Sequence, residues 1–105
     1  MIIKRPKLIN KEVEYSTPWF EVEAKTYDNI DLPYYALSLP DYVSVIATTQ
    51  EGQILLVRQF RPVVEEITLE LPSGCVDEGE TPEITARREL LEETGYEVQE
   101  IELLG

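Results

Sequence analysis

The sequence predicts an α+β fold in two parts, and three observations predict it. Residues 1–40 contain short β-favouring runs separated by turn residues, residues 41–71 contain further apolar runs of strand length, and residues 82–94 carry the end signals of a helix. The length of 105 residues and a hydrophobic content of 43% suit one packed domain. We therefore expect an N-terminal antiparallel β region over residues 1–40, followed by an α+β region over residues 41–105.

Short strands are expected on both sides of residue 40, because β-branched, aromatic and aliphatic runs alternate with turn residues. In the N-terminal region the expected strands are Glu12–Tyr15, Trp19–Lys25 and Leu32–Ser38, with a turn at Asp28–Asp31. In the second region they are a buried strand Tyr42–Thr48, a strand Gln53–Phe60 after a turn at Gln50–Gly52, and the strands Ile67–Leu71 and Glu97–Leu103. The expected helix lies between the last two.

The helix is expected to begin at Pro82 and to end at Thr94. Thr81 suits the N-cap position, because a proline at the first helical position follows it. Gly95 can close the helix in a left-handed conformation. Both ends are therefore predicted by local signals.

Three glutamates share one face of this helix. At 100° per residue, Glu89 and Glu93 lie one turn apart with Glu92 on their flank, while Ile84 and Leu91 point the opposite way. We expect the carboxylates to face outward and the aliphatic side chains to face the core. Like charges at this spacing repel, and a hard divalent cation such as Mg²⁺ would remove the repulsion. The alternative is an ordinary solvated helix face, which most glutamate runs form.

A fixed spacing connects these glutamates to the loop before the helix. The pattern is Gly74, five residues, Glu80, seven residues, Arg88-Glu89-Leu90, one residue, Glu92-Glu93, one residue, and Gly95-Tyr96. It resembles the Nudix box, and this relation favours a metal site over a plain solvated face.

The resemblance implies a role for each matched residue. It implies that Glu89, Glu92 and Glu93 bind Mg²⁺ or Mn²⁺, joined by the backbone carbonyl of Ser73. It implies a catalytic role for Glu92, Glu93 and Arg88. It further implies that Gly74, Glu80 and Arg88 orient the ligands, with Gly74 allowing a backbone conformation that a Cβ would obstruct.

The stretch before the box narrows the resemblance. Leu56–Pro62 (LVRQFRP) followed by Glu70–Gly74 (ELPSG) looks like the ADP-sugar pyrophosphatase branch of the family, especially the ADP-ribose hydrolases. The resemblance implies that Arg61 contacts the diphosphate, because a guanidinium can donate two parallel hydrogen bonds to phosphate oxygens. Arg58 and Glu70 are further substrate-binding candidates. The alternative for Arg61 is a surface salt bridge to Glu65 or Glu66.

The family resemblance also implies a fold and an activity. The fold is a mixed β-sheet with the box loop and helix in an α/β/α sandwich, of which the C-terminal part is expected to be missing here. The activity is Mg²⁺-dependent hydrolysis of the diphosphate linkage in a nucleoside diphosphate derivative, with ADP-ribose or an ADP-sugar favoured. The general base is expected outside this chain. The alternative is a truncated module or fragment that binds metal, nucleotide or a protein partner without efficient turnover.

The N-terminal strands are expected, from the same resemblance, to assist a homodimer and to help build the nucleotide pocket. Aromatic side chains in this region supply large contact areas and stacking surfaces. The candidates are Trp19, Phe20, Tyr34 and Tyr35. The alternative is that they form a small local core under the sheet.

Composition excludes several classes of function. The net charge of −12 disfavours a general nucleic-acid surface, and the lack of histidine excludes histidine-based catalysis or metal binding. Cys75 is the single cysteine, so no intramolecular disulfide is expected and a cytoplasmic location is the default. Without a histidine partner, we expect Cys75 to have a packing role. No apolar run in the sequence is long enough to predict a membrane-spanning helix.

Overall fold

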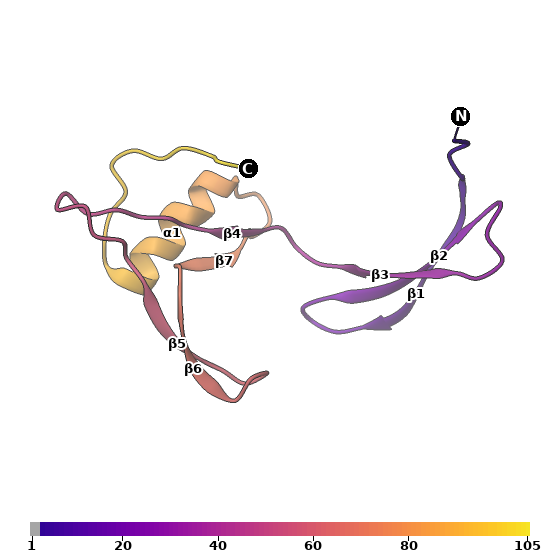
Figure 1. Ribbon diagram of the computed structural model, residues 1–105, viewed down its shortest axis with the longest axis horizontal. Coiled ribbons are helices and arrows are strands. Elements are labelled where there is room, and N and C mark those ends of the chain that lie inside the picture. Colours follow the sequence, from indigo (N-terminus) through magenta and orange to yellow (C-terminus); the bar gives the residue numbers. More distant parts are fainter. Residues whose placement is uncertain (1–2) are drawn as a thin grey trace. The chain divides into compact units, whose positions relative to one another are not determined.

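The computed structural model describes residues 3–105, which divide after Pro40 into two compact units (Figure 1). Within the described residues there are seven strands and one α-helix. All pairings between the named strands are antiparallel. The predicted α+β class and the predicted N-terminal antiparallel region are confirmed.

The N-terminal unit is one three-stranded sheet with the order β1-β2-β3. Its strands are β1 (Leu8–Ser16), β2 (Glu21–Tyr27) and β3 (Tyr34–Ser38). The first strand begins four residues earlier than expected, because its ladder with β2 continues to the pair Leu8 and Tyr27. The predicted turn after β2 is present, and there the N–H of Asp28 donates to the carbonyl of Lys7 at 3.0 Å.

This sheet buries very little apolar surface. Among residues 3–40, Ala24 is the one buried hydrophobic residue. Trp19 is 76% exposed, Tyr34 and Tyr35 are also exposed, and Phe20 is half-buried. The alternative of a small aromatic core under the sheet is therefore wrong for Trp19, Tyr34 and Tyr35. A three-stranded sheet can bury side chains only against a further layer, and residues 3–40 form none.

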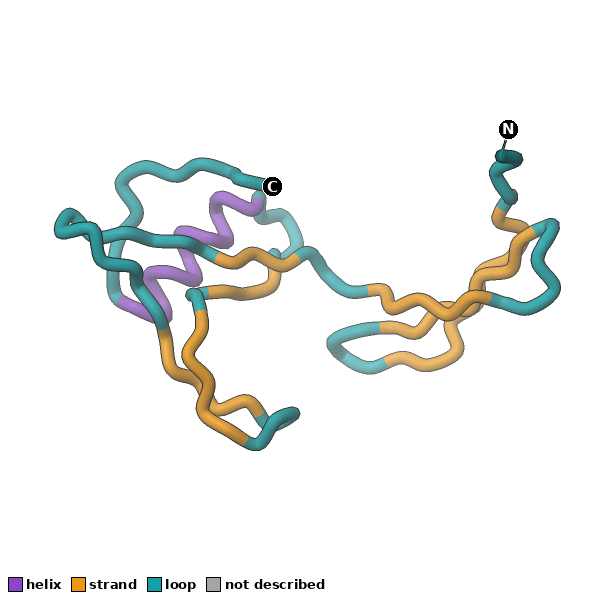
Figure 2. The backbone as a smooth tube through the Cα atoms, viewed as in Figure 1, coloured by secondary structure: helices purple, strands orange, loops and turns teal. Residues whose placement is uncertain are grey.

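The second unit contains two short antiparallel pairs and the helix (Figure 2). The first pair is β4 (Tyr42–Ser44) with β7 (Ser73–Cys75), and the second is the hairpin of β5 (Val57–Arg61) and β6 (Glu66–Glu70). Helix α1 (Pro82–Thr94) packs against β4 and β7. The structure thus brings the box loop, the box helix and β7 together.

In the N-terminal unit β2 and β3 each begin two residues later than expected, and three expected strands of the second unit differ more widely from the structure. The run Tyr42–Thr48 is a strand only as far as Ser44 and is not buried, and Gln53–Phe60 becomes a strand only at Val57. A single bridge between Thr48 and Ile54 joins their other ends. Residues 97–103, all within the described range, form no strand and run as a loop (Figure 2). There the carbonyl of Val98 accepts a hydrogen bond from the side chain of Arg87 at 2.9 Å.

The helix has the predicted ends. The hydroxyl oxygen of Thr81 accepts a hydrogen bond from the N–H of Ile84 at 3.3 Å, and Pro82 follows as the first helical residue. Gly95 has a φ of 77° and donates its N–H to the carbonyl of Leu91 at 2.9 Å. These are the two caps that the sequence predicted.

The predicted orientation of the helix is wrong. Ile84 is 50% exposed and Leu91 is 48% exposed, although both were expected to face the core. The buried helix residues are Thr85, Ala86 and Leu90. Helix α1 contacts β4 and β7, and Glu89 on its acidic face lies against Gly74 of β7. Among residues 3–105, no helix has the length and apolarity that crossing a membrane requires.

Candidate functional site

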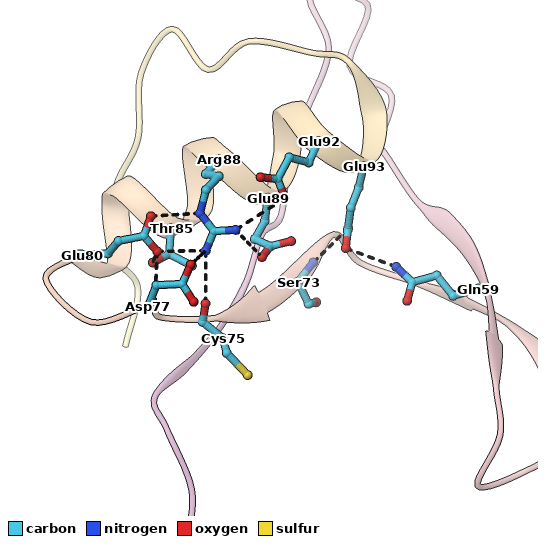
Figure 3. A network of polar contacts seen from close by, with 10 residues as sticks. All are labelled: Gln59, Ser73, Cys75, Asp77, Glu80, Thr85, Arg88, Glu89, Glu92 and Glu93. Atoms are coloured by element: carbon cyan, nitrogen blue, oxygen red, sulfur yellow. Dashed lines mark hydrogen bonds and ion pairs between the residues drawn. The ribbon is translucent and has the colours of Figure 1, made fainter. Parts of the chain in front are cut away.

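Arg88 is the centre of the polar network on α1 (Figure 3). Its Nε and Nη2 atoms donate to the two oxygens of Glu80, both at 2.9 Å. Its Nη1 donates to Glu89 at 2.9 Å and to Glu92 at 3.4 Å. Nη2 also reaches the carbonyl of Cys75 at 3.3 Å. One guanidinium therefore joins the loop before the helix, strand β7 and the acidic face of the helix.

Glu80 receives further hydrogen bonds from its surroundings. The hydroxyl of Thr85 donates to its Oε1 at 3.0 Å, and the N–H of Asp77 donates to the same atom at 3.1 Å. The hydrogen bonds from Arg88, and secondarily those from Asp77 and Thr85, lower the pKa of Glu80 to about 2. The same pairing raises the pKa of Arg88 above its usual value. The loop is thus held to the helix by a charged pair that stays ionised over the physiological range.

Glu89 is held close to Gly74 in strand β7. The side chain of Glu89 is only 14% exposed, and an added Cβ on Gly74 would overlap its carboxylate. Gly74 does not have a positive φ, unlike Gly52, Gly79 and Gly95. A Cβ would be obstructed here, as expected, but by the Glu89 side chain and not because of a left-handed backbone conformation. A glycine is required here because the helix carboxylate occupies the space of a side chain.

Glu93 and Glu92 lie in different surroundings. The two oxygens of Glu93 accept hydrogen bonds from the backbone N–H of Ser73 and from the amide of Gln59, each at 3.2 Å (Figure 3). Glu92 is 56% exposed, and its one hydrogen bond within the described residues comes from Arg88. Glu89 and Glu93 therefore flank the Ser73–Gly74 segment, while Glu92 lies toward solvent.

The donor chemistry at this segment fits a hard divalent cation. Mg²⁺ prefers oxygen ligands and is commonly held by one or two carboxylates together with substrate phosphates. Within residues 3–105, no three acidic side chains are grouped closely enough to form a complete metal site by themselves. The arrangement fits two carboxylates, those of Glu89 and Glu93, supplemented by backbone or substrate oxygens. Repulsion between the glutamates is not by itself evidence of a metal, because Arg88 already supplies a positive charge to Glu89 and Glu92.

Arg61 and Glu70 form a separate charged pair on the β5–β6 hairpin. Nε and Nη2 of Arg61 donate to the two oxygens of Glu70 at 2.7 and 2.5 Å, and Thr68 also bonds to this carboxylate. These bonds, led by that from Arg61, lower the pKa of Glu70 to about 2. The alternative prediction of a salt bridge from Arg61 to Glu65 or Glu66 named the wrong partner.

Arg58 is separated from the other substrate-binding candidates. Alternate residues of a strand point to opposite faces, so Arg58 lies on the other face of the hairpin from Gln59 and Arg61. That face is exposed, whereas Gln59, Arg61 and Glu70 are half-buried. The structure thus brings Arg61 and Glu70 together and leaves Arg58 apart from them.

Cys75 is an exposed free thiol, so the expected packing role is wrong. Its contribution to the network is the backbone carbonyl, which accepts a hydrogen bond from Arg88.

The sequence did not predict the roles of Gln59, Asp77 and Thr85 in the network. Only Gln59 carried a signal, because it lies two residues before Arg61 and so shares a strand face with it.

Known proteins are similar to this chain in sequence and in fold. Residues 38–105 match the NUDIX domain family. The chain is 42% identical over 83 residues to a methanol dehydrogenase activator of Bacillus methanolicus, covering 73% of this chain and 45% of that protein. It is 48% identical over 62 residues to an ADP-ribose pyrophosphatase of Bacillus subtilis, covering 59% of this chain and 34% of that protein.

A solved structure supports the same relation at the level of fold. The crystal structure of an ADP compounds hydrolase matches with a TM-score of 0.75 at 22% identity, covering 95% of this chain and 56% of that chain. The chain spans between about a third and about a half of the length of these two curated relatives. The family match covers well over half of the chain and contains the whole box and its helix, so the chain belongs to the Nudix family.

Proposed function

We propose that this chain carries the metal-binding part of a hydrolase that cleaves the diphosphate linkage of a nucleoside diphosphate derivative. The observation that carries the proposal is the position of Glu89 and Glu93, two box glutamates that flank Ser73 and Gly74. ADP-ribose or an ADP-sugar is the favoured substrate, and the name of the Bacillus subtilis relative supports that class.

Nudix hydrolases generally use divalent metals, and we propose Mg²⁺ here, with Mn²⁺ as a substitute. Glu89, Glu93 and the carbonyl of Ser73 would hold the ion, with Glu92 as a further ligand on the solvent side. When bound, the ion would neutralise the diphosphate, polarise a P–O bond and help to activate water. Arg88 and Glu80 would hold the loop and the helix together and so keep these ligands in position. Their two hydrogen bonds to each other support this role.

Arg61 is the proposed contact for the diphosphate. Glu70 accepts hydrogen bonds from its Nε and Nη2 atoms, and within residues 3–105 its Nη1 group makes none, so Nη1 can donate to a phosphate oxygen. Glu70 thereby orients the guanidinium without using all of its donors. This arrangement supports substrate-binding roles for both residues, with Arg61 in direct contact and Glu70 behind it.

A homodimer built through the N-terminal unit is also proposed. Trp19, Tyr34 and Tyr35 are exposed aromatic side chains, which are the type enriched at protein interfaces and at stacking sites. Their exposure supports either a subunit contact or a nucleotide contact.

A cytoplasmic location is also proposed, because a chain with a single cysteine suits a reducing compartment.

The variant Glu93→Gln tests the proposed activity. The amide keeps the size of the side chain and removes the charge of a ligand, so we expect Mg²⁺-dependent hydrolysis of ADP-ribose to fall by at least about 100-fold with little change in melting temperature. Glu100→Gln makes the same chemical change at an exposed loop position and is the matched control. Turnover is measured by chromatography of the phosphate products.

Two results would contradict the proposal. Wild-type turnover by Glu93→Gln at saturating Mg²⁺ would remove Glu93 from the set of essential ligands. A wild-type chain that binds the metal but hydrolyses neither ADP-ribose nor an ADP-sugar would favour the alternative, a module that binds without efficient turnover.

A further inference from the structure

Gln59 connects the β5–β6 hairpin to helix α1. Its Nε2 atom donates to Oε1 of Glu93 at 3.2 Å (Figure 3). Among the hydrogen bonds of residues 3–105, this is the one that joins the helix to the hairpin. The two residues are 34 positions apart in sequence, so the contact depends on the tertiary fold.

The contact also determines how the Glu93 carboxylate is oriented. An ionised carboxylate only accepts hydrogen bonds, so the nitrogen of the Gln59 amide must face it. Ser73 donates its backbone N–H to the other oxygen, also at 3.2 Å. Two donors on two different oxygens fix the rotation of the carboxylate about its last side-chain bond. Each oxygen keeps acceptor capacity for another partner.

The hairpin carries Gln59 and Arg61 on the same face. Gln59 lies opposite Thr68 in the ladder, and the single proton of the Thr68 hydroxyl can be donated to Glu70 or, at 3.4 Å, to the Gln59 carbonyl. Glu70 in turn holds Arg61 through two hydrogen bonds. Gln59 and Arg61 are therefore held on one strand face by two separate glutamates, Gln59 by Glu93 of the helix and Arg61 by Glu70 of β6.

We propose that Gln59 is a positioning residue that sets the Glu93 carboxylate and holds it in a defined place relative to Arg61. The proposal rests on the proposed function, in which Glu93 is a metal ligand and Arg61 contacts the diphosphate. Gln59 touches neither metal nor substrate in this scheme. It acts through Glu93, as hydrogen-bond partners of metal ligands generally do.

The variant Gln59→Leu removes the amide donor and keeps a side chain of similar bulk. We expect the Kd for Mn²⁺, measured by titration calorimetry without substrate, to rise by about 10–100-fold. We also expect kcat for ADP-ribose to fall while KM changes little, because the contact of Arg61 with substrate is retained. Gln53→Leu, at an exposed position before the same hairpin, is the control and should bind Mn²⁺ as the wild type does.

A purely structural role for Gln59 makes a different prediction. It would lower the melting temperature and leave the Mn²⁺ affinity of the folded protein unchanged, which would overturn the proposal. Gln59→Met keeps the length of the side chain without a donor and serves as the second variant if Gln59→Leu folds poorly. Wild-type Mn²⁺ affinity in either folded variant counts against positioning by Gln59.

The same titrations separate this proposal from the proposed function. Loss of Mn²⁺ binding in Glu93→Gln together with wild-type binding in Gln59→Leu would overturn only the role of Gln59. A wild-type chain that binds Mn²⁺ without hydrolysing ADP-ribose would overturn only the activity, and weakened binding by Gln59→Leu would still support its positioning role. A wild-type chain that binds no Mn²⁺ would overturn both.

Discussion

The variant Gly74→Ala tests the close approach of the helix to strand β7. The added Cβ would lie 2.7 Å from Cγ of Glu89 and closer still to its carboxylate. Non-bonded carbon atoms are at their optimum about 3.5–4.0 Å apart, so the Glu89 side chain must move by about 1 Å. Overpacking of this kind costs about 1–3 kcal/mol of stability.

The assay is thermal unfolding in two backgrounds. In the wild-type background, each kcal/mol lost corresponds to a fall of roughly 4–8 °C in the melting temperature of a domain of this size. In the Glu89→Ala background the atoms that the new Cβ would meet are gone, so the loss caused by Gly74→Ala should nearly disappear. Because a misplacement of about 1 Å can reduce a rate by about 10²-fold, Mg²⁺-dependent turnover should also fall when Glu89 is present.

An equal loss of stability in both backgrounds would refute this reasoning. It would mean that alanine at position 74 destabilises the protein by straining the backbone, and that the Glu89 side chain does not contribute to this loss of stability. Gly52→Ala provides a reference for backbone strain, because Gly52 has a φ of +80° and open space around the position of a Cβ. Its cost should be the same whether residue 89 is glutamate or alanine.

Three further outcomes are expected. Thr81→Ala should lower the free energy of unfolding by about 1 kcal/mol in urea titrations, because the N–H of Ile84 loses its cap; an unchanged midpoint would contradict the capping role. The folded-state pKa of Glu80 is about 2 against an ordinary value of 4.5, so its pairing with Arg88 contributes stability above pH 4.5 that is lost as the pH falls toward 2. Urea titrations across this range should show a steeper loss for the wild type than for Glu80→Gln, and parallel curves would contradict the assignment. If the N-terminal unit forms the dimer, light scattering should give a dimer mass for the full chain and a monomer mass for residues 41–105, and a full chain that stays monomeric at micromolar concentration would defeat the dimer.

The ends of the helix were predictable because their signals are local. A threonine cap, a proline at the first helical position and a glycine after the last turn act within a few residues of the chain. The face that packs inward was not predictable in the same way. Periodicity predicted the aliphatic side of Ile84 and Leu91, whereas the contact with β7 uses Ala86 and places Glu89 against a glycine.

The candidate site shows the same division between local and tertiary information. The spacing of the box was enough to predict that the three glutamates share one side of the helix, because the helical repeat fixes the angle between residues. It could not indicate that Gln59 binds Glu93, or that Arg61 pairs with Glu70. Those contacts depend on where the hairpin lies and on the register of its two strands.

The network around Arg88 leaves this part of the surface strongly anionic. Four carboxylates lie in ion-pair contact with its single guanidinium, those of Asp77, Glu80, Glu89 and Glu92. Among these five groups the negative charges exceed the positive charge by three, in a chain whose net charge is already −12. Such a field concentrates cations at the surface before any of them is coordinated, and it weakens as salt shortens the screening length to about 8 Å at physiological ionic strength. The rate at which this surface captures a divalent ion should accordingly fall as the ionic strength rises.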